Sequence, residues 1–339
     1  PAISFWLGYY IVSKRRVMPK INTVKGKIDP NDLGFTLMHE HLCNTSAGIP
    51  KAFPSLLDRS EAIDRAVNFL GEAEKEGVRS FIDVTTMDLG RDMDLIQRVA
   101  DRTEIHIVVA TGIWIDVPRA IDRGVSVDRL AEAFIRDIEV GLDGTSVKPG
   151  IIKVATDERG VTPVNETILR AAARASRHTG IPITTHTSAQ DKVGIGQIKV
   201  FEQEGLDLST VYIGHSNDTD DLEYLSYIAN KGCTIGMDRY PGGRLGGLQW
   251  KERTQTVKNL IDLGLVEKVT LSHDYPMTMM LEDKAELERQ SSAYNPDGIA
   301  FINRQVIPLL KEMGVTDEQI DIMMIDVPRR YFGGHRNAQ

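Results

Sequence analysis

Eight short β-rich runs alternate with longer amphipathic stretches along this chain, and this alternation constrains the fold more than any other feature of the sequence. The runs are Phe35–Leu42, Ser80–Thr85, His106–Gly112, Gly150–Ala155, Pro182–Thr187, Val211–Ser216, Thr234–Arg239 and Val269–Asp274. Two adjacent strands joined by a helix are expected to lie parallel, because parallel strands need a long crossover connection. The runs therefore predict the strands of one parallel sheet.

The stretches between the strands show the periodicity of amphipathic helices. They are Glu61–Glu76, Asp92–Arg102, Ser126–Gly141, Val164–His178, Gly194–Glu204, Asp220–Lys231 and Lys251–Leu263, with Phe301–Met313 and Asp317–Met324 after the last strand. Thr162 and Asp220 are candidate N-caps, and Gly180 is a candidate helix terminator. Eight strand–helix units in 339 residues predict an α/β fold of the (β/α)8 TIM-barrel type. A doubly wound open sheet is the alternative, disfavoured because no Gly-rich nucleotide loop follows the first strand.

The chain shows no internal repeat or low-complexity linker, so we predict one domain over residues 18–339 after an N-terminal extension, residues 1–17. The apolar part of the extension is shorter than the ~20 residues of a membrane-spanning helix. Its charges follow the apolar run, which is the reverse of the order in a secretory signal. We expect a cytoplasmic protein without a membrane partner, and a membrane-surface anchor in the extension is the alternative.

The composition of the chain excludes two classes of protein. A formal net charge of −8 disfavours a general nucleic-acid binder, which normally carries a basic face. The two cysteines, Cys43 and Cys233, form no CxxC pair and no framework, so disulfides are not needed. Cys233 is interpreted as a small buried hydrophobe.

Four of the eight histidines fall at the C-terminal ends of predicted strands. His39 and His41 lie two apart in FTLMHEHL and therefore point to one side of a strand. His186 in TTHT, His215 in IGHS and Asp274 in SHD end three further strands. Each of these residues alone has a structural interpretation, as a polar residue at a loop entrance or as a helix cap. The strand ends of a barrel meet at one rim, however, and histidine and carboxylate are metal ligands, so the set indicates a metal site.

Lys153 in GIIKVAT lies on a predicted barrel strand, where burial of an ammonium is costly. Burial and nearby cations both favour its neutral amine. A neutral amine can add carbon dioxide and become an anionic carbamate, whose two oxygens can bridge two metal ions. The alternative is a lysine that extends to a loop carboxylate.

The motifs GFTLMHEH, GIIKVATDE, TTHT, IGHSNDTDD and SHD occur in this order between about Ile21 and Phe332. In this combination the sequence resembles the phosphotriesterase family of the amidohydrolase superfamily, which includes organophosphate triesterases and phosphotriesterase-like lactonases. The resemblance implies a binuclear centre with zinc as the expected metal, although cobalt and manganese suit the same ligands. It also implies a homodimer.

The resemblance further assigns roles to single residues. It implies that the more buried metal is bound by His39, His41 and Asp274, the more exposed one by His186 and His215, and that both are bridged by carbamylated Lys153. A hydroxide that bridges the metals would attack the substrate, and Asp274 would take its proton. Asp218 and Arg239 match positions of a proton relay, and a structural ion pair is an equally consistent interpretation of these two residues.

Residues around the site point to two substrate classes. Trp114 matches the aromatic wall of the triesterases, where lactonases commonly carry tyrosine, and Cys43 and Thr45 match small pocket residues. Arg239, by contrast, is placed as in the lactonases, and the segment Pro241–Trp250 is shorter than in the triesterases.

Two further residues are predicted to contact substrate. With the short segment after the seventh strand, Tyr240 is expected to line the leaving-group side. Met277 belongs to a Met-rich stretch that is expected to form an adaptable apolar wall, with helix packing as the alternative.

We therefore predict a binuclear metal-dependent hydrolase of neutral small-molecule esters, cleaving aryl dialkyl phosphates and also lactones. The first alternative is a lactonase, acting on substrates that include N-acyl homoserine lactones, with incidental triesterase activity. Two others remain: an amidohydrolase of a cyclic amide, for which no group that protonates nitrogen is evident, and a catalytically silent barrel that binds small hydrophobic ligands.

Overall fold

The structure is a computed structural model that describes residues 19–242, 247–275 and 294–333 of the chain. Eight parallel strands follow one another around a barrel in chain order, each paired with its sequence neighbours. They are β3 (Phe35–Glu40), β4 (Val78–Asp83), β5 (His106–Ile113), β6 (Ile151–Ala155), β7 (Ile183–His186), β8 (Val211–Ile213), β9 (Thr234–Met237) and β10 (Val269–Leu271). The predicted extension over residues 1–17 and Met277 lie outside the described residues.

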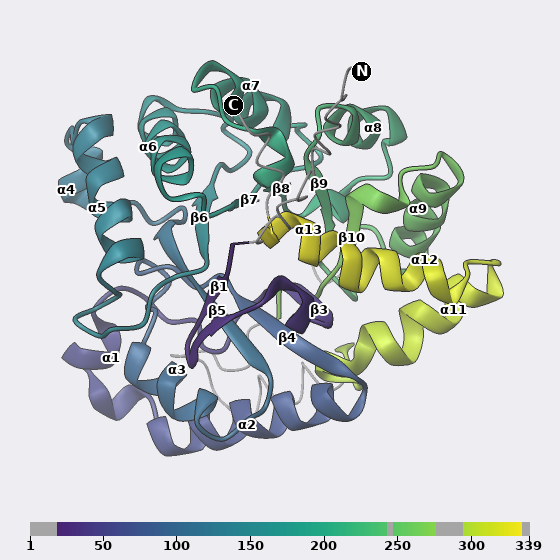
Figure 1. The fold of residues 1–339 in the computed structure, drawn as a ribbon, viewed down its shortest axis with the longest axis horizontal. Helices are drawn as coiled ribbons and strands as arrows, with labels where there is room; N and C mark the ends of the chain where they lie inside the picture. The colour runs from purple at the N-terminus through teal and green to yellow at the C-terminus, as the bar shows by residue number, and fades with distance from the viewer. Residues whose placement is uncertain (1–18, 243–246, 276–293, 334–339) are drawn as a thin grey trace, which may run out of the picture.

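Backbone hydrogen bonds just beyond the last strand close the barrel between its first and last strands. The Asp274 N–H donates to the His39 carbonyl at 3.0 Å, and the His41 N–H donates to the Tyr275 carbonyl at 3.2 Å. Helices lie outside the strands on all sides (Figure 1). The prediction of a (β/α)8 barrel is confirmed.

The helices include the nine predicted segments to within a few residues, together with three short helices, beginning at residues 49, 119 and 327, that the sequence did not predict. They are α1 (Ile49–Ala52), α2 (Arg59–Lys75), α3 (Met93–Ala100), α4 (Arg119–Asp122), α5 (Val127–Glu139), α6 (Pro163–Thr179), α7 (Gly194–Gln203), α8 (Leu222–Asn230), α9 (Trp250–Asp262), α11 (Ile307–Glu312), α12 (Asp317–Asp321) and α13 (Val327–Gly333). Thr162 caps α6 and Gly180 ends it with φ 78°, as predicted. The N-cap of α8 is Asp221 rather than Asp220, because the Asp221 carboxylate accepts from the backbone of the first turn. None of the helices in the described residues is long and apolar enough to cross a bilayer.

The sequence did not predict the hairpin of β1 (Ile21–Thr23) and β2 (Gly26–Ile28), because three-residue strands are too short to show a period. The Val24 N–H after β1 donates to the Ile107 carbonyl of β5 at 2.9 Å. Tyr331 of α13 donates to the Ile183 carbonyl of β7 at 2.6 Å. Because Ile107 and Ile183 lie at the starts of their strands, the hairpin and α13 cover the N-terminal end of the barrel, in front of the strands in Figure 1.

A β-bulge in β3 decides which side chains of the first strand face inward. Leu37 lies opposite Phe81 of β4, but Glu40 lies opposite Asp83, so β3 has one extra residue over this interval. Met38 belongs to the apolar cluster inside the barrel, whereas Leu37 belongs to the cluster between the strands and the helices. Bulges often redirect side chains beside active sites, and this one lies immediately before the two histidines.

Candidate metal centre

The six predicted ligands meet at the C-terminal rim of the barrel. His39 and His41 come from the end of β3, Lys153 from β6, His186 from β7, His215 from the turn after β8 and Asp274 from the turn after β10. His39 Nε2 lies 2.9 Å from Lys153 Nζ and 3.5 Å from Asp274 Oδ1. His41 Nε2 lies 3.2 Å from the same Asp274 oxygen. One part of the site is therefore formed by two imidazoles, one carboxylate and the lysine.

His186 and His215 form the other part of the site. His186 Nδ1 lies only 2.7 Å from His215 Nε2. Asp274 connects the two parts, because its Oδ2 lies 3.8 Å from His215 Nδ1. His215 (φ 59°) and Asp274 (φ 53°) both adopt the left-handed backbone conformation. This conformation is uncommon for residues other than glycine, and it is found most often where function requires it.

Oxygen acceptors behind the histidines select the nitrogen that each histidine presents. His41 Nδ1 lies 2.8 Å from Thr85 Oγ1, and His215 Nδ1 lies 3.0 Å from Asp238 Oδ1. His39 Nδ1 lies 2.8 Å from Asp238 Oδ2. We assign the proton to Nδ1 in all three rings, which leaves the Nε2 lone pairs for the centre.

The charges at the site favour neutral imidazoles and an ionised Asp274. Burial, and after it the Arg239 charge, lowers the pKa values of His186 and His215 well below the ordinary histidine value. Burial alone would raise the pKa of Asp274. The neighbouring rings of His215, His41 and His39 and the permanent charge of Arg239 outweigh burial, so this pKa lies well below the ordinary aspartate value.

Lys153 is buried at the centre of these groups, as its position in the sequence predicts. Its residue exposure is 1%, and burial lowers its pKa to about 8 against the opposing carboxylates of Asp274 and Asp238. A substantial fraction of the amine is therefore neutral near physiological pH. A neutral amine is the form that adds carbon dioxide.

The donor set fits divalent metal ions. Trp114 Nε1 donates to His186 Nδ1 at 3.2 Å, so this nitrogen is an acceptor. His215 Nε2 is an acceptor too, because the ring proton is on Nδ1. With the ring protons assigned in this way, His186 Nδ1 and His215 Nε2 are two unprotonated nitrogens 2.7 Å apart, which a cation could share as ligands. His39, His41 and Asp274 likewise place ligand atoms within metal-binding distance of one another.

Arg239 connects Asp274 to Asp218. The Arg239 Nε–H donates to Asp274 Oδ2 at 3.1 Å, and its Nη1 donates to Asp218 Oδ2 at 2.6 Å. Arg253 of α9 donates to the other Asp218 oxygen at 2.8 Å. Because arginine stays protonated, it cannot pass a proton from one carboxylate to the other. The geometry instead suits an orienting and charge-stabilising role for Arg239.

The predicted substrate-binding residues lie in different environments. Trp114 is half-buried with its ring edge-on to His186, 5.7 Å between centroids, and its backbone N–H donates to buried Asp88. Thr45 is partly exposed in the loop after β3, where its N–H donates to the Leu89 carbonyl. Among the predicted substrate-binding residues that the structure describes, Trp114 is the one with a recorded contact to a predicted ligand.

Cys43 and Tyr240 are buried in the core between the strands and the helices. Cys43 is 5% exposed and packs in the outer core, where burial raises its thiol pKa to about 12. The Tyr240 ring is 2% exposed in the same core, and its hydroxyl lies 3.5 Å from Thr254 Oγ1 of α9. Both side chains pack in the core between the strands and the helices, and contact of these two residues with substrate stays a prediction.

Three residues of the site were not identified from the sequence. Asp238 is fully buried, accepts from the His215 backbone at 2.7 Å and contacts the rings of both His39 and His215. Its place in MDRY, directly after a predicted strand core, was the available signal. Arg253 and Thr85 offered no comparable signal, because a helix arginine and a strand-end threonine are ordinary residues.

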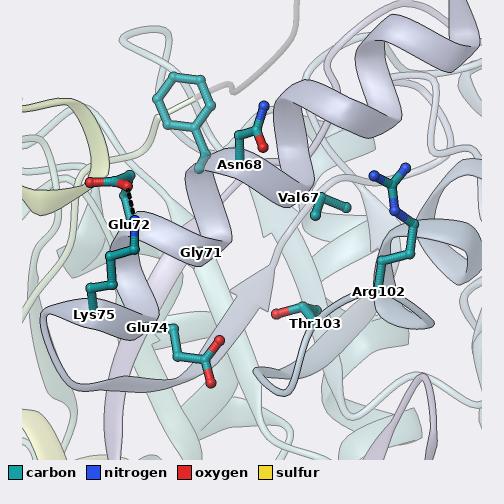
Figure 2. Close-up of a pocket in the computed structure, with 9 residues that line it drawn as sticks. Val67, Asn68, Gly71, Glu72, Glu74, Lys75, Arg102 and Thr103 are labelled. Carbon is teal, nitrogen blue, oxygen red and sulfur yellow. Dashed lines mark hydrogen bonds and ion pairs between the residues drawn. The ribbon is translucent and has the colours of Figure 1, made fainter.

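A surface hollow of about 480 Å³ lies far from this centre, along the C-terminal half of α2. Figure 2 shows Arg102 and Thr103 on one side of it and the Glu72–Lys75 ion pair on the other. These segments lead into the starts of β4 and β5, so the hollow belongs to the opposite end of the barrel. Its charged side chains do not converge on one point, and we assign no chemistry to it.

A parallel barrel with imidazoles, a carboxylate and a buried lysine at its C-terminal rim is the architecture of a metal-dependent barrel hydrolase. The sequence model of the phosphotriesterase family matches residues 19–332. This chain belongs to the phosphotriesterase family, as its motifs predicted. It is a hydrolase of that family, and its histidine and aspartate groups fit a divalent metal site.

Individual relatives cover nearly the whole chain. A phosphotriesterase homology protein of Mycobacterium tuberculosis is 40% identical over 331 residues, 94% of this chain and 100% of that protein. An aryldialkylphosphatase of Saccharolobus solfataricus is 38% identical over 311 residues, 91% of this chain and 98% of that protein. Human N-acetyltaurine hydrolase is 25% identical over 354 residues, 92% of this chain and 97% of that protein. The names of these relatives cover more than one type of hydrolase.

Proposed function

We propose that this protein is a binuclear metal-dependent hydrolase that cleaves neutral organophosphate triesters, above all aryl dialkyl phosphates, and also opens lactones. The observation that carries the proposal is the convergence of two ligand groups on Lys153 and Asp274. One metal ion would be held by His39, His41 and Asp274 and the other by His186 and His215. Zinc suits this set of nitrogen and oxygen ligands, and cobalt or manganese can replace it.

Lys153 is proposed to bridge the two ions as a carbamate. Its neutral amine adds carbon dioxide and releases one proton, which turns a neutral group into an anion with two ligand oxygens. The lowered pKa of Lys153, about 8, supports this reaction because a fully protonated lysine has no lone pair to add. Its burial supports the product, since the two cations compensate the new negative charge.

When bound, the metal pair would lower the pKa of a shared water and polarise the P=O or C=O bond of the substrate. Asp274 Oδ1 faces His39 and His41, and Oδ2 faces Arg239. Oδ2 is therefore the oxygen proposed to accept a proton while Oδ1 remains a ligand. Arg239 keeps Asp274 ionised and correctly oriented between turnovers, and Asp218 holds Arg239 in place.

Trp114 supports a triester with an aromatic leaving group. Its half-buried indole lies against His186, the proposed ligand of the more exposed metal. A flat apolar surface there would pack against an aryl group or alkyl substituents. The 38% identity to an aryldialkylphosphatase is consistent with this substrate class.

A lactonase with incidental triesterase activity is the second candidate. Arg239 favours it, because the sequence carries an arginine at this position as the lactonases that it resembles do, and in this chain the guanidinium lies beside Asp274. N-acyl homoserine lactones are among the substrates that this alternative includes. Both reactions would use the same residues of the centre, so substrate preference separates them.

The deciding experiment measures kcat/KM for 4-nitrophenyl diethyl phosphate and for a series of γ- and δ-lactones, with metal content determined on the same sample. Two metal ions per chain and a clearly higher triester value would support the triesterase. Lactone values higher by orders of magnitude would make lactone hydrolysis the main activity. A chain that binds no divalent metal and hydrolyses neither class would contradict the proposal.

A further inference from the structure

Glu40 separates the two histidines of the HEH motif, and its side chain does not face the metal centre. It is fully buried. Its Oε1 accepts hydrogen bonds from Ser272 Oγ at 2.7 Å, from the His273 backbone at 2.8 Å and from His273 Nδ1 at 2.7 Å. Its Oε2 accepts from the Tyr275 backbone at 3.0 Å. All four contacts therefore come from one short segment at the end of β10.

The residue in the middle of that segment is Asp274, the proposed ligand and proton acceptor. Its neighbours on both sides, His273 and Tyr275, donate their backbone N–H groups to Glu40. The Asp274 N–H itself donates to the His39 carbonyl at 3.0 Å. Asp274 adopts φ 53°, a conformation that a non-glycine residue keeps only when its surroundings impose it. The Glu40 carboxylate supplies that constraint.

We propose that Glu40 is a positioning residue that holds Asp274 in its ligand geometry across the seam of the barrel. In the HEH motif, His39 and His41 would then face the metal, while Glu40 fixes a third ligand, Asp274. Asp274 follows Glu40 by 234 positions in the chain but lies beside β3 in the closed barrel. The inference rests on the proposed metal centre. It assigns to Glu40 no contact with metal or substrate.

The discriminating variant is Glu40→Gln. All four groups that face Glu40 are hydrogen-bond donors, so the amide of a glutamine must oppose at least one of them with its own donor. Tyr331→Phe is the matched control, because it removes a fully buried hydrogen bond at the opposite end of the barrel. Wild type and both variants are loaded with Co²⁺, and loss of its absorption is followed in excess chelator together with metal content.

Glu40→Gln is expected to release one of two Co²⁺ equivalents about 10- to 100-fold faster than wild type, as when other outer partners of metal ligands are removed. The second equivalent, on the side of His186 and His215, is expected to keep its wild-type rate. Tyr331→Phe is expected to lower thermal stability and to leave both rates unchanged. If neither equivalent is released faster from Glu40→Gln, or both are accelerated equally, the positioning role is wrong.

Ser272→Ala is the second variant, for the case in which Glu40→Gln does not fold. It removes one of the four hydrogen bonds to Glu40 and also the 3.0 Å bond that the His39 N–H donates to Ser272 Oγ, and it is expected to accelerate release of the same equivalent by about 3- to 10-fold. A wild-type rate in this variant would overturn the proposal. Wild-type protein that binds no metal would overturn the metal centre and Glu40's role together, whereas a stable two-metal wild type with unaffected variants would overturn Glu40's role alone.

Discussion

Arg239 donates its Nε–H to Oδ2 of Asp274 at 3.1 Å, on the side of the carboxylate that faces away from His41. One oxygen of Asp274 is thus directed to the candidate ligands and the other to a permanent cation. The same guanidinium binds Asp218 at 2.6 Å, and Arg253 fixes Asp218 from behind. Two carboxylates and two guanidinium groups therefore alternate from the centre outward, joined by charge-assisted hydrogen bonds.

Replacing Arg239 tests this arrangement. Arg239→Ala removes charge-assisted hydrogen bonds that contribute about 1.5–3 kcal/mol each, so kcat is expected to fall about 10- to 100-fold while metal content stays at the wild-type value. Arg239→Lys keeps the positive charge but not the planar guanidinium, so its kcat is expected to lie between those of wild type and Arg239→Ala. The matched control is Arg98→Ala, which breaks an exposed ion pair with Asp94. A wild-type kcat in Arg239→Ala would remove Arg239 from the reaction.

Asp238 orients one ligand histidine from each part of the site. In the wild type, one oxygen of Asp238 contacts His39 and the other contacts His215. Asp238→Asn replaces one of these two oxygens with an NH2 group, so only one of the contacts keeps its acceptor. We expect metal affinity to fall about 10- to 100-fold, measured by competition with a chromogenic chelator. Tyr212→Phe removes only the 3.0 Å hydrogen bond from Tyr212 to Asp238 and is expected to have a smaller effect. Equal affinity in Asp238→Asn and wild type would show that the histidines hold their orientation without Asp238.

Lys153 is tested by removal and chemical replacement. Lys153→Ala is expected to lose the metal pair and most activity, because no bridging anion remains between the two ligand groups. Added acetate or propionate is expected to restore part of both, since a small carboxylate can occupy the space left by the side chain. Metal content by mass spectrometry and activity are measured with and without the acid. Two metals and full activity in the untreated variant would contradict the carbamate.

Trp114 is expected to affect substrate choice rather than metal binding. Trp114→Ala removes the indole that lies against His186, so kcat/KM for triesters with aryl leaving groups is expected to fall more than kcat/KM for small lactones. Metal content is expected to remain unchanged, because Trp114 is not a proposed ligand. Trp114→Phe keeps an apolar ring and serves as the control. An unchanged ranking of the substrates would exclude the indole from the pocket.

The two cysteines are expected to be inert in the folded protein. Burial raises the pKa values of Cys43 and Cys233 to about 12, so at pH 8 the thiolate is about one part in ten thousand, and neither side chain is accessible. A thiol-reactive disulfide reagent is expected to label neither cysteine in buffer and both in guanidinium chloride. Rapid labelling of the native protein would show that one of the two sites opens.

The sequence determined the barrel and the positions of its ligands for one physical reason. In a parallel barrel every strand presents its C-terminal end to the same rim, so His39, His186 and His215 could be brought together from strand ends alone. Lys153 was identified because a buried lysine needs a compensating partner. These inferences depend on local sequence patterns and require no distances from the folded structure.

Only the tertiary structure decided which groups hold these ligands in place. The β-bulge in β3 turns His39 inward and leaves Glu40 at the seam. The bond from the His273 backbone to Glu40 joins residues 233 positions apart. Arg253 reaches Asp218 from a helix on the outside of the barrel, and Tyr240 turns into the core. A contact of this kind forms only if both side chains point toward each other. The packing of the whole barrel sets these orientations, so they cannot be inferred from local sequence patterns.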